Sequence, residues 1–418
     1  MPSFGRRSVL AGLACLGAGC ATPTAAPGDG ATVAPDGQRI GYPHLRASAN
    51  RIVSGQGNLP ESDPVELEVD ATPTWLAAVP RSQGSQWAVV DQTDTLSILT
   101  LDSGGATVAR TREWPATGPP VLVATDDGVR VVAPPQRASD LTPPLVLEDG
   151  LASVDVDGRL RIRQRTLDTD LLPDARLARL DKNRVVTLGG ATTRYSHGAL
   201  GDEVEASELL IVRTDEPAIE RRIEIPAPRV VEGVGPLVTD LGGERAIVVT
   251  ESGPADGAAL VAYRPDGSTL ARGDPIGTGF RWRHQVAAAP FGPDGEREIA
   301  VVKTPHIGGT VEFYGRRGDS LDIVAEVSGA SSHAFGSRNL DGGVAADADR
   351  DGRTELVVPD DNRGTLRGVE RRGDSAVVEW SVPIGGSLST NVVGVPHGDG
   401  LALGVGHTGG AVRFWLPD

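Results

Sequence analysis

Short segments in which apolar and polar residues alternate recur along the chain, separated by glycine, proline and aspartate. The clearest pair of copies lies near the C-terminus. Gly309–Phe313 leads to Arg316–Ser320, and Gly364–Gly368 leads to Arg371–Ser375, 55 residues later. Alternation with a period of two residues is typical of a strand with one buried face. The pattern therefore predicts a β-protein built from a repeated unit.

Seven segments match this strand, and they begin at Leu96, Leu160, Leu209, Leu260, Val311, Leu366 and Val412. The spacings between successive starts are 64, 49, 51, 51, 55 and 46 residues. A near-constant period of about fifty residues is typical of propeller blades, each a sheet of four antiparallel strands. We therefore predict an all-β fold, a seven-bladed β-propeller over residues 61–418. Six or eight blades remain alternatives, because the second blade is poorly marked.

An apolar run precedes each of these marker segments and is predicted to form the central second strand of its blade. In the second blade this strand is predicted over Val129–Val132, although Arg130 interrupts the run. The last marker segment lies at the C-terminal end of the chain, so its blade lacks a fourth strand from the same repeat. We expect the alternating segment Val65–Val69 to supply it, which would close the ring and remove an exposed sheet edge.

Composition and charge exclude one class of partner. Aromatic residues make up 4% of the chain, while 54 glycines and 31 prolines provide turn positions. The formal net charge is −16, and lysine is found only at positions 182 and 303. An acidic surface repels nucleic acid and favours cations, so no nucleic-acid partner is expected.

The N-terminal residues carry signals for export. Arg6 and Arg7 precede an apolar run from Val9 to Ala18, which is too short to span a bilayer. The pair resembles a twin-arginine export signal, and the general secretion route is the alternative.

The apolar run ends at Gly17–Cys20, which resembles a lipoprotein lipobox with Cys20 as the lipidated residue. The alternatives are lipidation of Cys15, and secretion without a lipid after cleavage near Ala21. We expect residues 1–20 to be an export signal with a lipobox and residues 21–60 to be a flexible tether. The mature protein would then be held on a membrane by its lipid anchor, at the periplasm, the outer membrane or the cell surface.

The most specific internal motif runs from Asp347 to Val358. Acidic residues stand at positions 1, 3, 5 and 9 of this loop, and Gly352 stands at position 6, where a sharp turn is needed. Oxygen ligands at alternate positions allow one tight loop to surround a hard cation. An EF-hand requires glutamate at position 12, where this chain has Val358, and the loop runs into a strand instead. A solvated acidic turn is the alternative.

Such a loop resembles those of FG-GAP and VCBS repeats, which also occur in integrin-type propellers, where the loop joins the first two strands of a blade. The resemblance covers residues 60 to 418 and is strongest over 284 to 418. It implies one structural calcium ion held by the side chains of Asp347, Asp349, Asp351 and Glu355. Arg353, at position 7, can add its carbonyl oxygen.

A polar segment, residues 194–203, interrupts the third blade and is longer than a hairpin requires. It contains His197 and Asp202, which we expect to form a ligand-binding or acid–base pair.

Further polar residues stand where two first strands are predicted to begin. Arg281, Arg283 and His284 open the fifth blade, and His333 opens the sixth. First strands line the channel of a propeller, so we expect these side chains and His197 to meet at its mouth. They would form a locally basic funnel for a small anionic ligand or the carboxylate of a partner. The alternative is that each residue hydrogen-bonds only within its own loop.

These features favour a non-enzymatic binding or scaffold protein of the cell envelope, whose partner is an envelope protein or a small anionic ligand. One alternative is a periplasmic propeller enzyme of the dehydrogenase or lyase type that uses the funnel. Another is an envelope assembly factor. The sequence has no nucleophile elbow, phosphate loop, zinc spacing or haem motif.

Overall fold

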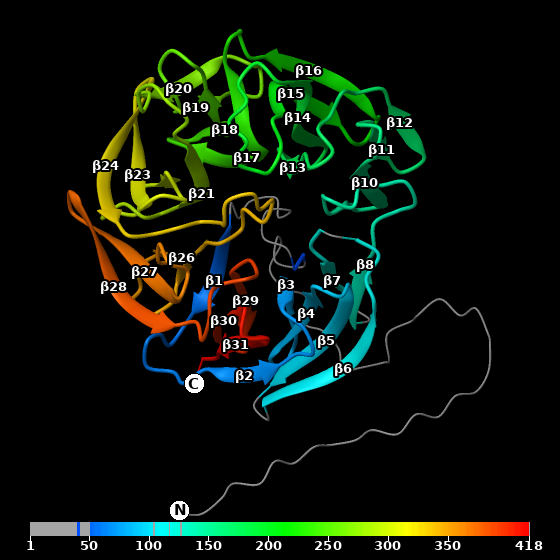
Figure 1. Cartoon of the computed structure of the whole chain (residues 1–418), viewed down its shortest axis with the longest axis vertical. Coiled ribbons are helices and arrows are strands. Elements are labelled where there is room, and N and C mark those ends of the chain that lie inside the picture. Colours follow the sequence, from blue (N-terminus) through cyan, green and yellow to red (C-terminus); the bar gives the residue numbers. More distant parts are fainter. Residues whose placement is uncertain (1–39, 42–50, 103–104, 117, 126–127, 418) are drawn as a thin grey trace, which may run out of the picture.

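The computed structural model describes residues 40–41, 51–102, 105–116, 118–125 and 128–417. Arg6, Arg7, Cys20 and most of the expected tether lie outside the described residues. Within them the regular elements are strands, arranged as small sheets around a central axis (Figure 1). The fold is an all-β propeller, as predicted. Among the described residues there is no helix long and apolar enough to cross a membrane.

Seven groups of four antiparallel strands can be followed around the described part of the ring. The first two groups are β3 (Pro73–Pro80), β4 (Ser85–Asp91), β5 (Thr95–Asp102) and β6 (Gly105–Glu113), then β9 (Leu145–Leu147), β10 (Gly150–Val154), β11 (Leu160–Ile162) and β12 (Arg165–Leu167). The next two are β13 (Ala178–Arg179), β14 (Arg184–Thr192), β15 (Glu205–Arg213) and β16 (Ala218–Glu224), then β17 (Val230–Leu241), β18 (Glu244–Ser252), β19 (Ala259–Tyr263) and β20 (Thr269–Gly273).

The last three groups complete the circuit. They are β21 (Arg283–Ala289), β22 (Glu298–Lys303), β23 (Thr310–Arg317) and β24 (Ser320–Ser328), then β25 (Val344–Asp347), β26 (Glu355–Pro359), β27 (Thr365–Arg372) and β28 (Ser375–Pro383), and finally β29 (Val393–His397), β30 (Gly400–His407), β31 (Ala411–Trp415) and β2 (Val65–Glu68). Each marker segment predicted from the sequence is the third strand of one group, namely β5, β11, β15, β19, β23, β27 and β31.

The N-terminal strand β2 closes the last group, as predicted. It runs antiparallel to β31, with Val65 opposite Phe414 and Leu67 opposite Val412. Val65 and Leu67 pack against a buried cluster that includes Trp87 and Phe414. The closure therefore combines backbone hydrogen bonding with apolar burial and removes one exposed sheet edge.

The predicted second strand of blade two is wrong. Val129–Val132 belongs to β8 (Gly128–Val132), which pairs with β7 (Val121–Thr125) in a separate two-stranded sheet. The strand before β11 is β10 instead. The long spacing of 64 residues contains this extra hairpin, which lies between β3–β6 and β10 (Figure 1). The number of blades depends on whether the hairpin is counted, so seven stays a prediction.

The expected tether also ends earlier than residue 60. Ile52–Gln56 forms β1, which runs parallel to β25 and extends the group β25–β28 to five strands. Val53 and Leu59 are buried among side chains of β25–β31. Two buried apolar residues in a polar, glycine-containing segment give too weak a pattern to predict a strand.

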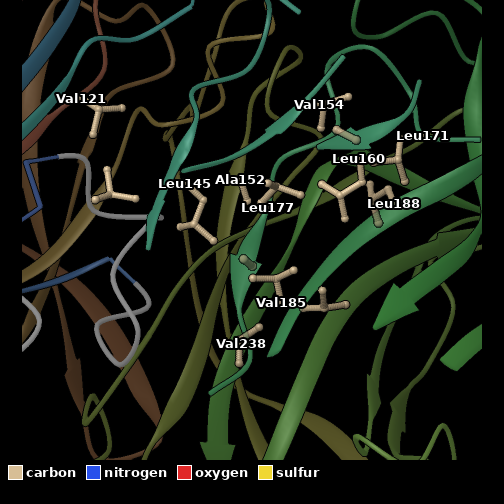
Figure 2. Close-up of a cluster of buried hydrophobic side chains, with 14 of the residues drawn as sticks. Val121, Leu145, Ala152, Val154, Leu160, Leu171, Leu177, Val185, Leu188 and Val238 are labelled. Atoms are coloured by element: carbon tan, nitrogen blue, oxygen red, sulfur yellow. The ribbon is translucent and has the colours of Figure 1, made fainter. Parts of the chain in front are cut away.

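Aliphatic side chains fill the spaces between neighbouring groups. Figure 2 shows Leu145, Ala152 and Leu160 of β9–β11. They lie near Leu177, which directly precedes β13, and near Val185 of β14 in the next group. Each fully buried leucine or valine side chain stabilises the fold by about 1.5–3 kcal/mol. Burial of this kind holds the sheets at fixed positions, which in turn fixes the loops between them.

The loops leave the ring on two faces. Successive strands of a group run in opposite directions, so loops between first and second strands share a face, which we call face A. Face A carries residues 348–354, between β25 and β26. Loops between second and third strands, and between one group and the next, lie on the opposite face B. Face B carries residues 193–204, 304–309 and 329–343.

We expect Leu67→Asp to weaken ring closure, because a charge would replace an apolar side chain that packs against the buried cluster. The free energy of unfolding should fall by about 2 kcal/mol in urea denaturation. The control is Glu68→Gln, on the exposed side of the same strand, which should leave stability unchanged. Equal stabilities of the Leu67→Asp variant and the wild type would contradict the role of β2.

Candidate functional site

The acidic loop on face A brings the predicted ligands together. Asp347 is the last residue of β25 and Glu355 is the first residue of β26. Single carboxylate oxygens of Asp347, Asp349, Asp351 and Glu355 lie within 4.8 Å of one another. Gly352 has a φ of 87° in the left-handed region, which glycine adopts without strain and which lets the loop turn back.

Backbone amides of the loop hold three of these carboxylates. The amide of Asp351 donates to Asp349 Oδ1 at 3.1 Å, and the amide of Arg353 donates to Asp351 Oδ1 at 2.8 Å. The amide of Ala348 donates to Glu355 Oε2 at 2.8 Å. The loop backbone therefore orients the carboxylates toward a shared centre, independently of any bound ion.

Two oxygens at this centre are buried and lack a hydrogen-bond partner, namely Glu355 Oε1 and Asp347 Oδ1. Glu355 is fully buried. Burial raises the pKa of Glu355 to about 9, and the adjacent Asp349 carboxyl contributes to the increase. Burial is also the main cause that raises the pKa of Asp349. A hard divalent cation would satisfy the two oxygens and remove the repulsion between the carboxylates, so the residues fit calcium.

The side chain of Arg353 does not enter this centre. Its guanidinium pairs with Glu370, whose other carboxylate oxygen accepts a hydrogen bond from Arg372 at 3.0 Å. The positive charge that stands within the acidic motif is therefore directed toward β27. A contribution of the Arg353 carbonyl to a bound ion stays a prediction.

The middle of the ring is occupied by residues 331–342, which we call the central loop (Figure 1). It is held by contacts from distant parts of the chain. Asn339 donates to the carbonyl of Thr74 at 3.3 Å, and Arg176 donates to the carbonyl of Arg338 at 3.0 Å. The central loop thus ties the first, third and sixth groups of strands together across the axis.

A buried ion cluster fixes the end of the central loop. The carboxylate of Asp341 lies 2.8 Å from the guanidinium of Arg51 and 2.6 Å from that of Arg176. These arginines, with His284 and Gln285, line a cavity of about 50 Å³. A water needs roughly 10–15 Å³ of such space, so the cavity has room for a few waters.

The structure brings His284 and His333 together and adds His306. Ser332 Oγ lies 2.8 Å from His284 Nδ1 and 3.0 Å from His333 Nδ1. His333 Nε2 lies 2.8 Å from His306 Nε2. Trp282 contacts all three imidazoles, with ring centroids 5.0 to 6.5 Å apart. The prediction that His333 opens a first strand is wrong, because it lies in the central loop and β25 begins at Val344.

The histidine cluster is not basic, in contrast to the predicted funnel. Burial lowers the pKa of His284 and His333 well below the ordinary value of 6.5. Burial also lowers the pKa of His306 to about 4. The three imidazoles are therefore neutral at pH 7 and hydrogen-bond to protein groups.

Arg281 and Arg283 do not join this cluster. Arg283 Nε donates to the buried carboxylate of Glu312 at 3.0 Å. Consecutive side chains of a strand point to opposite sides of the sheet, so Arg283 and His284 of β21 point in opposite directions. Arg281 is exposed and donates to the carbonyl of Thr278 at 3.0 Å.

The predicted pairing of His197 with Asp202 is also wrong. His197 Nδ1 lies 2.6 Å from Glu232 Oε1, and Asp202 pairs with Arg338. Each partner comes from a distant part of the chain, so the local sequence holds no signal for it. Phe280 stacks on the His197 ring, with centroids 5.2 Å apart.

The histidine cluster makes stability fall in acid. Because the folded-state pKa values of His284 and His333 are lowered, the unfolded chain binds more protons below pH 6.5. The contribution of these two histidines to the free energy of unfolding is thus fully present above pH 6.5 and is lost as the pH falls. The slope should be about 1.4 kcal/mol per pH unit for each histidine.

Urea denaturation between pH 8 and pH 4.5 measures this slope. His333→Asn should reduce it by the contribution of one proton below pH 6.5, while above pH 7 the two proteins should show the same pH dependence. Identical slopes for the wild type and the variant would contradict the assignment.

No family model and no curated protein matches the chain. Among solved structures, it is similar to BBS1N in complex with ARL6DN, with a TM-score of 0.36 and 13% identity over 85% of this chain and 97% of that chain. For the C-terminal WD40 domain of Sif2 the TM-score is 0.49, with 11% identity over 85% and 99%. For Chaetomium thermophilum Raptor it is 0.43, with 11% identity over 88% and 30%. These similarities concern the fold alone.

Proposed function

We propose that this chain is an exported, lipid-anchored β-propeller that acts as a binding or scaffold protein at the cell envelope. It carries one structural calcium ion in the acidic loop between β25 and β26, as in the FG-GAP and VCBS repeats that this loop resembles. The propeller fold is consistent with a binding or scaffold role. Export and lipidation rest on the motifs at Arg6, Arg7 and Cys20.

The observation that carries the proposal is the set of four converging carboxylates around the buried oxygen of Glu355. Asp347, Asp349, Asp351 and Glu355 would hold the ion, with the carbonyl of Arg353 as a further oxygen ligand. The ion would supply positive charge and no reaction chemistry. Its effect would be to fix the junction of β25 and β26, because binding to the folded state alone stabilises that state.

The central loop, which lies in the middle of the ring, supports recognition by an outer surface. Three large apolar side chains are exposed on loops of face B: Phe280 at 59%, Ile307 at 82% and Phe335 at 70%. The Phe335 ring lies 5.3 Å from His306, next to the neutral histidine cluster. Exposed apolar residues that gather on one face are typical of protein-interaction sites. An envelope protein that docks on face B fits this surface better than a small anion does.

Calcium binding can be tested by titration calorimetry and thermal unfolding. The wild type should bind one calcium ion per chain and become more stable by about 2.7 kcal/mol at a hundredfold excess over Kd. Glu355→Gln should abolish both effects, since glutamine cannot ionise to supply a carboxylate to the ion. Asp294→Asn, in the loop between β21 and β22, is the matched control and should bind as the wild type does. Calcium-independent stability of the wild type would refute the site.

The binding role can be tested by crosslinking on intact cells that express the full chain. We expect Phe335→Ser to lose a specific crosslinked product, because the exposed ring would no longer pack against a partner. Ile323→Ser, which changes an exposed apolar residue of β24, should retain it. Loss of the product in both variants or in neither would count against face B as the docking surface.

A further inference from the structure

The strand β1 reaches the acidic loop from the other end of the sequence. Gln56 Nε2 donates to Asp347 Oδ2 at 2.7 Å. Two backbone amides continue the contact: that of Gly57 donates to the carbonyl of Asp347 at 2.8 Å, and that of Leu59 donates to the carbonyl of Ala348 at 2.9 Å. Three hydrogen bonds therefore join the N-terminal segment to the beginning of the loop.

The approach of the two segments is close. A Cβ atom at Gly57 would lie 2.2 Å from the carbonyl oxygen of Ala348, so a side chain at this position would push the segments apart. Val53 and Leu59 are buried at 3% and 2% exposure on either side of Gln56. Burial on both sides and a glycine at the narrowest point fix the backbone of Gln56, and its exposed side chain reaches Asp347 from there.

The two carboxylate oxygens of Asp347 have different surroundings. Gln56 binds Oδ2, while Oδ1 is buried and has no hydrogen-bond partner. With Oδ2 held, the carboxylate plane is set and Oδ1 is available to a cation. Gln56 therefore acts on the calcium centre through Asp347.

We propose that β1 is part of the calcium centre, with Gln56 as a positioning residue, and that calcium fastens residues 52–59 to the sheet β25–β28. This inference rests on the proposed calcium site. Coupling of this kind is reciprocal: if the docked strand increases the affinity for calcium, calcium stabilises the docked strand by the same factor.

The coupling extends to face B. Arg51, directly before β1, donates to the carbonyl of Leu340 at 3.1 Å and pairs with Asp341. The short strand thus connects the acidic loop on face A to the central loop, which carries Phe335. Calcium in the loop would thereby order both ends of β1.

Calorimetry on Gln56→Leu tests the positioning role. Calcium affinity should fall roughly 10- to 100-fold, as is typical when a group that orients a metal ligand is lost. Gln92→Leu makes the same chemical change at an exposed position far from the loop and should bind as the wild type does. Gly57→Ala, which leaves Gln56 intact, should also weaken binding because it displaces the segment.

Hydrogen exchange on the full chain supplies the second readout. In the wild type, calcium should slow exchange at the amides of Gly57 and Leu59 about tenfold or more, and this protection should be absent in Glu355→Gln. Suppose that the wild type and both variants, Gln56→Leu and Gly57→Ala, bind calcium equally well and that calcium leaves exchange at the two amides unchanged. The inference is then wrong, while the calcium site itself stands. If the wild type binds no calcium, both fall.

Discussion

Closure of the ring depends on the N-terminal segment from Arg51 to Glu68, which contacts three separate parts of the propeller in turn. Its arginine holds Asp341 at the end of the central loop, β1 lies along β25, and β2 supplies the outer strand beside β31. A circular array of sheets has a weak point where its last blade meets its first. Here the same short segment closes that point and reaches the middle of the ring.

The acidic loop matters to this arrangement because it gathers acidic side chains beside the end of β1. Four carboxyl groups converge, and burial raises the pKa of one of them, Glu355, to about 9. Without a cation the group can only remain protonated or ionise at a cost in stability. A calcium ion would resolve this conflict and, through Asp347 and Gln56, hold the closing segment in place.

Features that depend on neighbouring residues were predictable from the sequence. The marker strands alternate within a few residues, and the acidic loop places its four carboxylates within nine consecutive positions, from Asp347 to Glu355. The closing strand β2 also shows the alternation. Features that depend on contacts between distant residues were not predictable. Gln56 meets Asp347, His197 meets Glu232 and Asp202 meets Arg338, and none of these pairs leaves a local pattern. The hairpin β7–β8 was missed because a fixed repeat length leaves no place for it.

The most direct test of the account is the number of protons released when calcium binds near pH 7.5, measured by calorimetry in two buffers with different heats of ionisation. Because Glu355 has a pKa of about 9 before the ion binds, one calcium ion per chain should displace about one proton. Binding at this stoichiometry without proton release would show that the carboxylates are not forced together as described. Absence of binding would contradict the calcium centre itself.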